Sequence, residues 1–262
     1  MQFSESYLIA AIAVYMWPFI RIAACLMSMF TIGSQSVPVL VRLALAVAVT
    51  WCMCETIPHP QFLDPFSVTG FLTVGREFLI GITIGFITQF IAEIFVVAGQ
   101  VIAMQTGLGF ASLVDPVSGT NTPVVGQFFT VLTTLLFLVI DGHLMLLRML
   151  RLSFFALPIS ATMPDIPWTE IASFGSLMFV IALGLSISSI CAMLLVNFTF
   201  GVMTRAAPQL NIFSLGFAIS MLAGLIILKM VLSGFWIHFE DAMNRVFNLG
   251  CTILGTSCPN VF

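Results

Sequence analysis

The chain has 262 residues, of which 60% are hydrophobic and 7% are charged, and its formal net charge is −3. A soluble domain carries about a quarter charged residues, so this composition excludes a surface made for water. It predicts an integral membrane protein in contact with membrane lipid. Only 8 residues are Lys or Arg, which excludes nucleic acid and anionic lipid headgroups as the main partner.

Six apolar runs divide the chain, at residues 7–30, 37–54, 66–104, 124–159, 171–203 and 212–237. A helix needs about 20 residues to cross the hydrocarbon core of a bilayer. The first and last runs fit one crossing each and the second is at the short limit, whereas the other three are too long for one straight span. We therefore expect an all-α membrane protein in which the long runs tilt, bend or fold into hairpins.

The cysteines and the start of the chain indicate neither a metal site nor a cleaved leader. A basic region followed by a small-residue cleavage site is missing, so we expect residues from 7 onward to remain as a membrane segment. Cys52 and Cys54 have no histidine and no second cysteine pair near them, so we expect no metal site. Cys251 and Cys258 could bridge in an oxidising compartment, but we expect free thiols.

Ionisable residues inside the apolar runs are candidates for function. A charge in a membrane span is costly, and it usually faces a partner helix or a water-filled cavity. Two of them, Asp141 and Arg148, lie two turns apart on one helical face and could pair within the chain or across an interface. The full set is Arg21, Arg76, Glu77, Glu93, Asp141, His143, Arg148 and Lys229.

The longest apolar run carries small and polar residues at helical spacing. Gly81 and Gly85 form a small-x-x-x-small pair, which allows two helix backbones to approach closely. Gln89, Glu93 and Gln100 share one face of the same helix. We expect this face to pack against protein, and two uses remain open. It could line a conduit or bind a partner subunit, or its hydrogen bonds could only hold the fold together.

Motifs for covalent chemistry are absent from the sequence. It contains no H-E-x-x-H, G-x-S-x-G or G-x-x-x-x-G-K-[ST] pattern, and its three histidines are isolated at positions 59, 143 and 238. We therefore expect neither enzymatic activity nor a cofactor.

Four stretches together resemble the FliR/SctT family: GREFLIGITIGF (75–86), AGQVIAMQTGLGFASLVDP (98–116), GHLMLLRMLRLSF (142–154) and TRAAPQLNIFSLGF (204–217). This family supplies the export-gate subunit of bacterial flagellar and virulence type III secretion systems. The resemblance covers roughly residues 7–245 and is stronger to the flagellar branch, through QLNIFSLGF and the DP after the glycines. The family usually has proline after GF, whereas Ala218 follows here, so we expect the next helix to begin less sharply.

The resemblance implies one subunit of a closed, hetero-oligomeric export gate in the bacterial inner membrane, at the flagellar basal body. Its partners would be FliP-, FliQ- and FlhB-type membrane subunits, and its substrates would be secreted, unfolded flagellar proteins. The implied fold is a single membrane domain of bent helical hairpins. Residues 1–120 would resemble FliP-type hairpins up to a glycine-rich loop, and the last part of residues 121–262 would resemble a FliQ-type hairpin.

The glycine-rich loop at residues 106–121 is similar to the family's plug, which closes the pore. Its glycines allow backbone conformations that other residues resist, and the apolar side chains beside them would form a constriction that gates by dewetting. Its Asp–Pro and Ser–Gly pairs are typical of turns. The alternative is an ordinary turn between two spans. The candidate pore residues are Gly107, Leu108, Gly109, Phe110, Leu113, Asp115, Pro116 and Gly119.

The resemblance also implies contacts with neighbouring subunits around Arg205. Pro208 can end one helix and Asn211 can cap the next, and the polar side chains of this element can contact other subunits as well. The candidate contact residues are Gly81, Gly85, Gln89, Glu93, Gln100, Arg205, Pro208, Gln209, Asn211 and Phe213.

Two other functions remain open from the sequence. The chain could be a secondary transporter for a small solute, with a broken helix at residues 66–104 and Glu93 near the midplane. It could also be a scaffold that nucleates the assembly without lining its pore.

Overall fold

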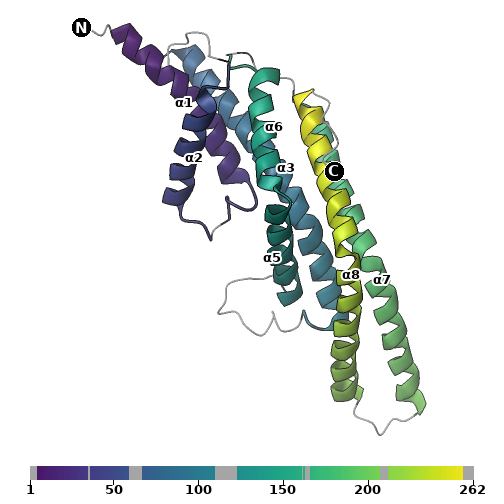
Figure 1. Ribbon diagram of the computed structural model, residues 1–262. Helices are drawn as coiled ribbons and strands as arrows, with labels where there is room; N and C mark the ends of the chain where they lie inside the picture. Colours follow the sequence, from purple (N-terminus) through teal and green to yellow (C-terminus); the bar gives the residue numbers. More distant parts are fainter. Residues whose placement is uncertain are drawn as a thin grey trace. The chain divides into compact units, whose positions relative to one another are not determined.

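The structure, a computed structural model, describes residues 5–34, 36–58, 67–109, 123–160, 162, 166–206 and 212–255 (Figure 1). Every regular element in these described ranges is a helix, which confirms the all-α prediction. The helices are α1 (Glu5–Ser28), α2 (Val39–Cys54), α3 (Val68–Thr106), α5 (Val124–Val139), α6 (Gly142–Ala156), α7 (Trp168–Ala206) and α8 (Ile212–Leu254).

Three helices are long and apolar enough to cross a membrane, namely α3, α7 and α8. The helices α3 and α7 have 39 residues each and α8 has 43. At ~1.5 Å per residue they measure about 58 to 64 Å, about twice the ~30 Å hydrocarbon core. The protein is therefore a membrane protein whose main helices exceed the length of one crossing.

Each of the last two apolar runs lies in one long helix. Of the tilt, bend or hairpin expected for residues 171–203, the hairpin is ruled out, because α7 is one helix that contains no proline and only isolated glycines. Helix α8 extends beyond the apolar run at residues 212–237, through the charged stretch to Leu254. It begins at Ile212, directly after the position at which the sequence predicts a helix cap, so Ala218 lies in the helix interior.

The apolar run at residues 124–159 is bent, as its length predicts. Helices α5 and α6 meet at 66°. Asp141 between them is left-handed, with φ 58° and ψ 28°, a conformation that Asp tolerates better than most residues. A methyl group on Gly142 would lie 2.6 Å from the Phe137 ring, so the residue after the bend must be small.

Asp141 and Arg148 do not pair within the chain. Both side chains are exposed, and no ion pair joins them among the residues that the structure describes. The bend explains this result, because Asp141 is the left-handed N-cap of α6 and does not lie on its regular helical face.

Helices α1 and α2 pack against each other. Only Ala46, Thr50 and Cys54 of α2 are buried, and the rings of Tyr15 and Trp51 stack at 5.8 Å beside this stripe. The turn between the helices is closed by Arg42, whose guanidinium donates to main-chain oxygens at residues 34 and 37. Most of α2 therefore presents apolar side chains to its surroundings.

The chain forms two compact units. Unit 1 comprises Met1–Phe90, Phe137–Ile171 and Asn244–Phe262, and unit 2 comprises Ile91–Leu136 and Ala172–Met243. In unit 2, helices α7 and α8 run in opposite directions (Figure 1). Its core is a cluster of phenylalanine rings from α3, α5 and α8, in which Phe235 lies 4.5 Å from Phe95 and 5.5 Å from Phe129.

Cys251 is disulfide-bonded, so the expectation of a free thiol there is wrong. Gly255 follows closely with φ 63°, and a left-handed glycine after a helix lets the chain reverse its direction. Cys258 lies outside the described residues. Cys25, Cys52, Cys54 and Cys191 are free thiols.

The left-handed backbone at Asp141 predicts a graded response to substitution. Asp141→Val should lower the free energy of unfolding by about 1–2 kcal/mol, because a β-branched residue resists positive φ. Asp141→Gly should not lower it, and thermal unfolding in detergent measures both. Asp141→Asn removes the charge and tolerates positive φ, so it should melt like wild type. Equal losses in all three variants would show that the carboxylate matters and the backbone does not.

Candidate functional site

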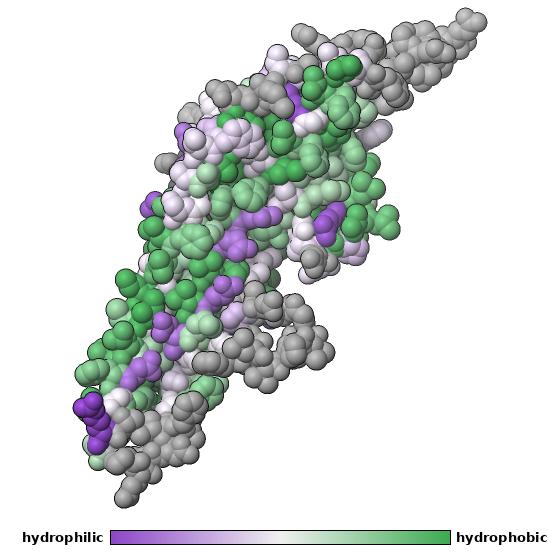
Figure 2. Space-filling view, turned by 180° about the vertical axis from the view of Figure 1, so that it is seen from behind, coloured by the Kyte–Doolittle hydropathy of each residue, from purple (hydrophilic) through white to green (hydrophobic). Residues whose placement is uncertain are grey.

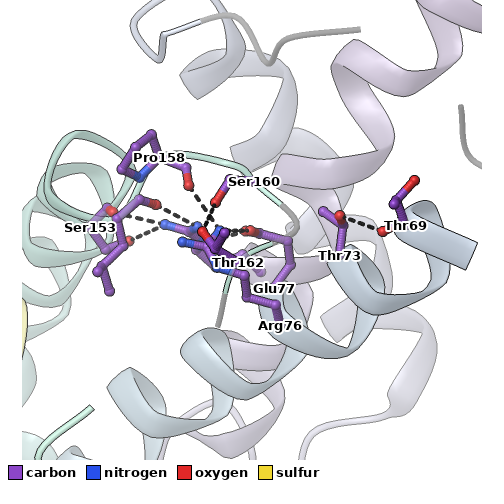
Figure 3. A network of polar contacts seen from close by, with 10 residues as sticks. Thr69, Thr73, Arg76, Glu77, Ser153, Pro158, Ser160 and Thr162 are labelled. Atoms are coloured by element: carbon purple, nitrogen blue, oxygen red, sulfur yellow. Dashed lines mark hydrogen bonds and ion pairs between the residues drawn. The ribbon is translucent and has the colours of Figure 1, made fainter. Parts of the chain in front are cut away.

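A buried cluster of charged residues lies in unit 1, between α1 and α3. Arg21 Nε donates to Glu77 Oε2 at 2.6 Å, and both side chains are 0% exposed. The other carboxylate oxygen accepts from Arg76 Nη1 at 2.9 Å, so one carboxylate bridges two guanidiniums (Figure 3). The Arg21 guanidinium also lies 4.2 Å from the centre of the Phe154 ring.

Other donors of the two arginines reach the end of α6. Arg21 Nη1 donates to the main-chain oxygen of Ser153 at 2.9 Å, and Nη2 donates to that of Leu157 at 2.9 Å. Arg76 Nη1 donates to the main-chain oxygen of Pro158, also at 2.9 Å. Carbonyl groups at a helix C-terminus carry partial negative charge, which offsets the extra positive charge of the cluster. The cluster therefore joins α1, α3 and α6.

The sequence did not predict this network. Arg21, Arg76 and Glu77 were each recognised as costly in an apolar run, but Arg21 and Glu77 are 56 positions apart. Most of the other acceptors are main-chain oxygens, which carry no sequence signal. The only hint was that three such charges occur in runs that otherwise contain almost none.

Gly81 and Gly85 bring α3 against α1. A Cβ atom at either position would overlap a main-chain oxygen of α1, that of Arg21 or of Cys25. This confirms the predicted close approach of two helices. One turn further, Gln89 Nε2 donates to the main-chain oxygen of Ser28 at 2.9 Å. These contacts lie within the chain, and a role of the same residues in subunit contact stays a prediction.

The other two polar residues of this face are left without such a contact. Glu93 is exposed and Gln100 is half-buried, and neither bonds to another side chain in the part of the chain that the structure describes. Helix α3 runs unbroken from Val68 to Thr106. The broken helix that the transporter hypothesis placed here is therefore wrong, because no proline or glycine pair interrupts the run.

The glycine-rich loop begins as a cap on α3. Gly107 has φ 80°, and the Gly109 N–H donates to the main-chain oxygen of Ala103 at 2.9 Å, which turns the chain back over the last helical turn. Leu108 between them is half-buried. The other candidate pore residues lie outside the described residues: Phe110, Leu113, Asp115, Pro116 and Gly119.

The start of the loop contacts α8. A methyl group on Gly107 would lie 3.3 Å from Cε2 of Phe217 and 3.7 Å from Oγ of Ser220. The preceding Thr106 packs so closely on Gly224 that a Cβ atom there would overlap its side chain. The sequence missed these contacts, because nothing in residues 217–224 indicates which helix they face.

Arg205 lies at the end of α7 with its side chain exposed. Together with Asn197, Phe198, Gly201 and Val202 it lines a surface hollow of about 530 Å³. Pro208, Gln209 and Asn211 lie outside the described residues, as does the side chain of Phe213. Their predicted part in subunit contact stays a prediction.

No group of three or more His, Cys, Asp or Glu that could hold a metal ion occurs within the described ranges. The polar contacts that the structure does describe include the buried ion cluster and hydrogen bonds from arginine, serine, threonine and glutamine side chains to the main chain. Both are interactions that position helices.

Comparison with known proteins points to one group. The family model "Bacterial export proteins, family 1" matches residues 12–246. The chain is 35% identical over 242 residues to a flagellar biosynthetic protein FliR of Pectobacterium carotovorum subsp. carotovorum, covering 92% of either chain. It is 31% identical over 255 residues to the Escherichia coli (strain K12) protein of the same name, covering 97% of either chain. A third relative of that name, from Aquifex aeolicus (strain VF5), is 29% identical over 247 residues.

Removing the bridging carboxylate should destabilise unit 1. Glu77→Gln keeps the shape of the side chain but leaves two buried guanidiniums without an anion, and breaking a buried pair in this way costs about 3–5 kcal/mol. The expected result is a large drop in the midpoint of thermal unfolding in detergent. Glu93→Gln is the matched control, since it makes the same change at an exposed site on the same helix. Equal midpoints for both variants would contradict a stabilising role of the cluster.

The contact of α3 with α1 predicts a second difference between matched variants. Gly85→Leu adds a side chain where a Cβ atom already overlaps α1, and overpacking of this kind costs about 1–3 kcal/mol or more. Gly75→Leu adds the same side chain to α3 where nothing lies within 4 Å of a Cβ atom. We expect Gly85→Leu to unfold at a lower temperature and Gly75→Leu to unfold like wild type. The reverse order would refute the close approach.

Proposed function

Because the chain belongs to family 1 of the bacterial export proteins, we propose that it is a subunit of the flagellar type III protein export gate. In this proposal it assembles with FliP-, FliQ- and FlhB-type membrane subunits in the bacterial inner membrane, at the flagellar basal body. Together they form a gated channel for unfolded flagellar proteins, and the chain itself performs no covalent chemistry.

The observation that carries the proposal is apolar surface that extends further than a bilayer can cover. Exposed large apolar residues occur on α7 from Trp168 to Met203, about 54 Å of helix at ~1.5 Å per residue. A ~30 Å core crossed at a tilt of 40° covers about 39 Å. The exposed residues include Phe179, Val180, Leu183, Ile187, Leu194, Leu195, Phe198 and Val202.

Helix α3 shows the same excess, with exposed apolar residues from Val68 to Met104. Green, hydrophobic atoms cover much of the face drawn in Figure 2. Apolar surface outside the hydrocarbon core needs a protein partner, because large exposed apolar patches are unfavourable in water. These lengths support assembly with other membrane subunits.

Two exposed charges support the same conclusion. Glu93 of α3 and Lys229 of α8 are exposed in apolar helices, and no described residue pairs with either. A charge that faces lipid at mid-depth costs about 2.5–3.5 kcal/mol or more. Both residues therefore favour an environment of partner protein or of water in a channel.

In this gate we propose that the glycine-rich loop, residues 106–121, is the plug. Leu108, Phe110 and Leu113 would form its apolar constriction, and Asp115–Pro116 and Gly119 would form the turns that end it. The left-handed Gly107 supports this role, because it turns the chain away from α3 instead of continuing the helix.

Deleting the loop tests the proposal. Cells in which the chain lacks residues 110–121 should take up a membrane-impermeant dye several-fold faster than wild-type cells, because the channel loses its closure. A Gly–Ser segment of equal length in place of the deleted residues should leak as well, since it restores length but not the apolar constriction.

Assembly is the control for this experiment. The shortened chain, carrying an affinity tag, should still copurify with the other membrane subunits. An intact assembly with an unchanged barrier would contradict the plug and favour a scaffold. If the purified chain alone, in vesicles, moved a small solute, the gate proposal would be wrong.

A further inference from the structure

We infer that one face of α8, formed by Phe217, Ser220 and Gly224, is the docking site that holds the end of α3 and the first residues of the glycine-rich loop. The docking itself is independent of the loop's role. Its consequence, that this face sets the closed position of the plug, rests on the proposed function. The three residues are spaced i, i+3 and i+7, so they share one helical face.

Gly224 lets the two helices meet. A Cβ atom at Gly224 would lie 2.5 Å from Cβ and 2.6 Å from Cγ2 of Thr106, so any larger residue would push α3 away. Thr106 is buried and its hydroxyl donates to the main-chain oxygen of Ile102 at 2.9 Å, which fixes the methyl group toward α8. Further along α8, a Cβ atom at Gly234 would meet nothing within 4 Å.

Gly107 completes the contact. Its positive φ ends α3, and its lack of a side chain leaves room for the Phe217 ring, 3.3 Å from where a Cβ atom would lie. Gly109 is buried and hydrogen-bonded to the last turn of α3. The backbone from Thr106 to Gly109 is therefore held from two sides, by its own helix and by α8.

Helix α8 is regular across the docking site. Because α8 begins at Ile212, a proline at position 218 would remove a main-chain hydrogen bond inside the helix and would kink it. Ala218 keeps the helix regular through Phe217 and Ser220. In this chain the docking face is thus one continuous helical surface.

Chemical cross-linking between the start of the loop and α8 measures the docking, and the result does not depend on whether the loop closes a channel. Leu108→Cys and Ser220→Cys are combined in a full-length chain whose exposed Cys52 and Cys191 are changed to serine. A short bifunctional thiol reagent, applied to the assembled membranes, should join the two positions in high yield. The joined chain is detected by its changed mobility in denaturing gels.

Two substitutions should break the docking, and two matched ones should not. Phe217→Ala and Gly224→Leu should each reduce the cross-linked fraction several-fold. Leu222→Ala removes an apolar side chain that is 63% exposed on the same helix, and Gly234→Leu adds one in open space. Phe217 is itself 45% exposed, so its truncation opens no closed cavity and the variant should fold.

The uptake of the impermeant dye then tests the consequence for closure. Cells with Phe217→Ala or Gly224→Leu should leak several-fold more than cells with either control. A cross-linked fraction that none of the substitutions changes would overturn the docking site. A fall in cross-linking without a leak, in cells where loop deletion does leak, would overturn its role in closure. If loop deletion itself causes no leak, the proposed plug fails, and the cross-linking still decides the docking.

Discussion

The buried pair of Arg21 and Glu77 is the interaction on which the packing of unit 1 depends. A second arginine binds the other oxygen of the carboxylate, and main-chain oxygens at the end of α6 accept further hydrogen bonds from both arginines. Gly81 and Gly85 follow Glu77 at one-turn intervals on α3, opposite α1. The ion pair and the glycine contact are therefore one interface, in which the charges fix the register and the glycines fix the distance.

In unit 2, helix α3 again contacts its neighbours closely at small residues. Gly99 lies against Gly126 of α5, where a Cβ atom would come within 2.9 Å of the opposite backbone, and Thr106 packs on Gly224 of α8. In both units a small residue sits where α3 meets a neighbour, so this helix is held closely along its length. The loop that begins at Gly107 thus starts from the end of a well-anchored helix, which is consistent with its proposed role as the plug.

The sequence predicted where the helices lie better than it predicted which helices contact one another. Apolar runs predicted the helices because membrane-spanning length and composition are local properties, and Gly81 with Gly85 predicted a close contact because the spacing itself carries the signal. For the α7 run the sequence left tilt, a bend or a hairpin open, because length alone cannot tell a long helix from two short ones. The docking of Gly107 on Phe217 was not foreseen either. Both that contact and the Arg21 network depend on which helices meet, and no periodicity within one helix encodes this.

The two carboxylates of α3 lie in opposite environments, one buried and one exposed, and this difference bears on function. Glu77 is fully buried and bridges two arginines, whereas Glu93, on the same helix, is exposed without a described partner. In an apolar helix, moving either charged side chain from water into the membrane costs free energy. The chain satisfies the first charge within its own core. The second, like Lys229 on α8, has no ion-pair partner among the described residues. Exposed charges and exposed apolar surface beyond one bilayer width thus both support the proposal that this chain is one subunit of a larger membrane assembly.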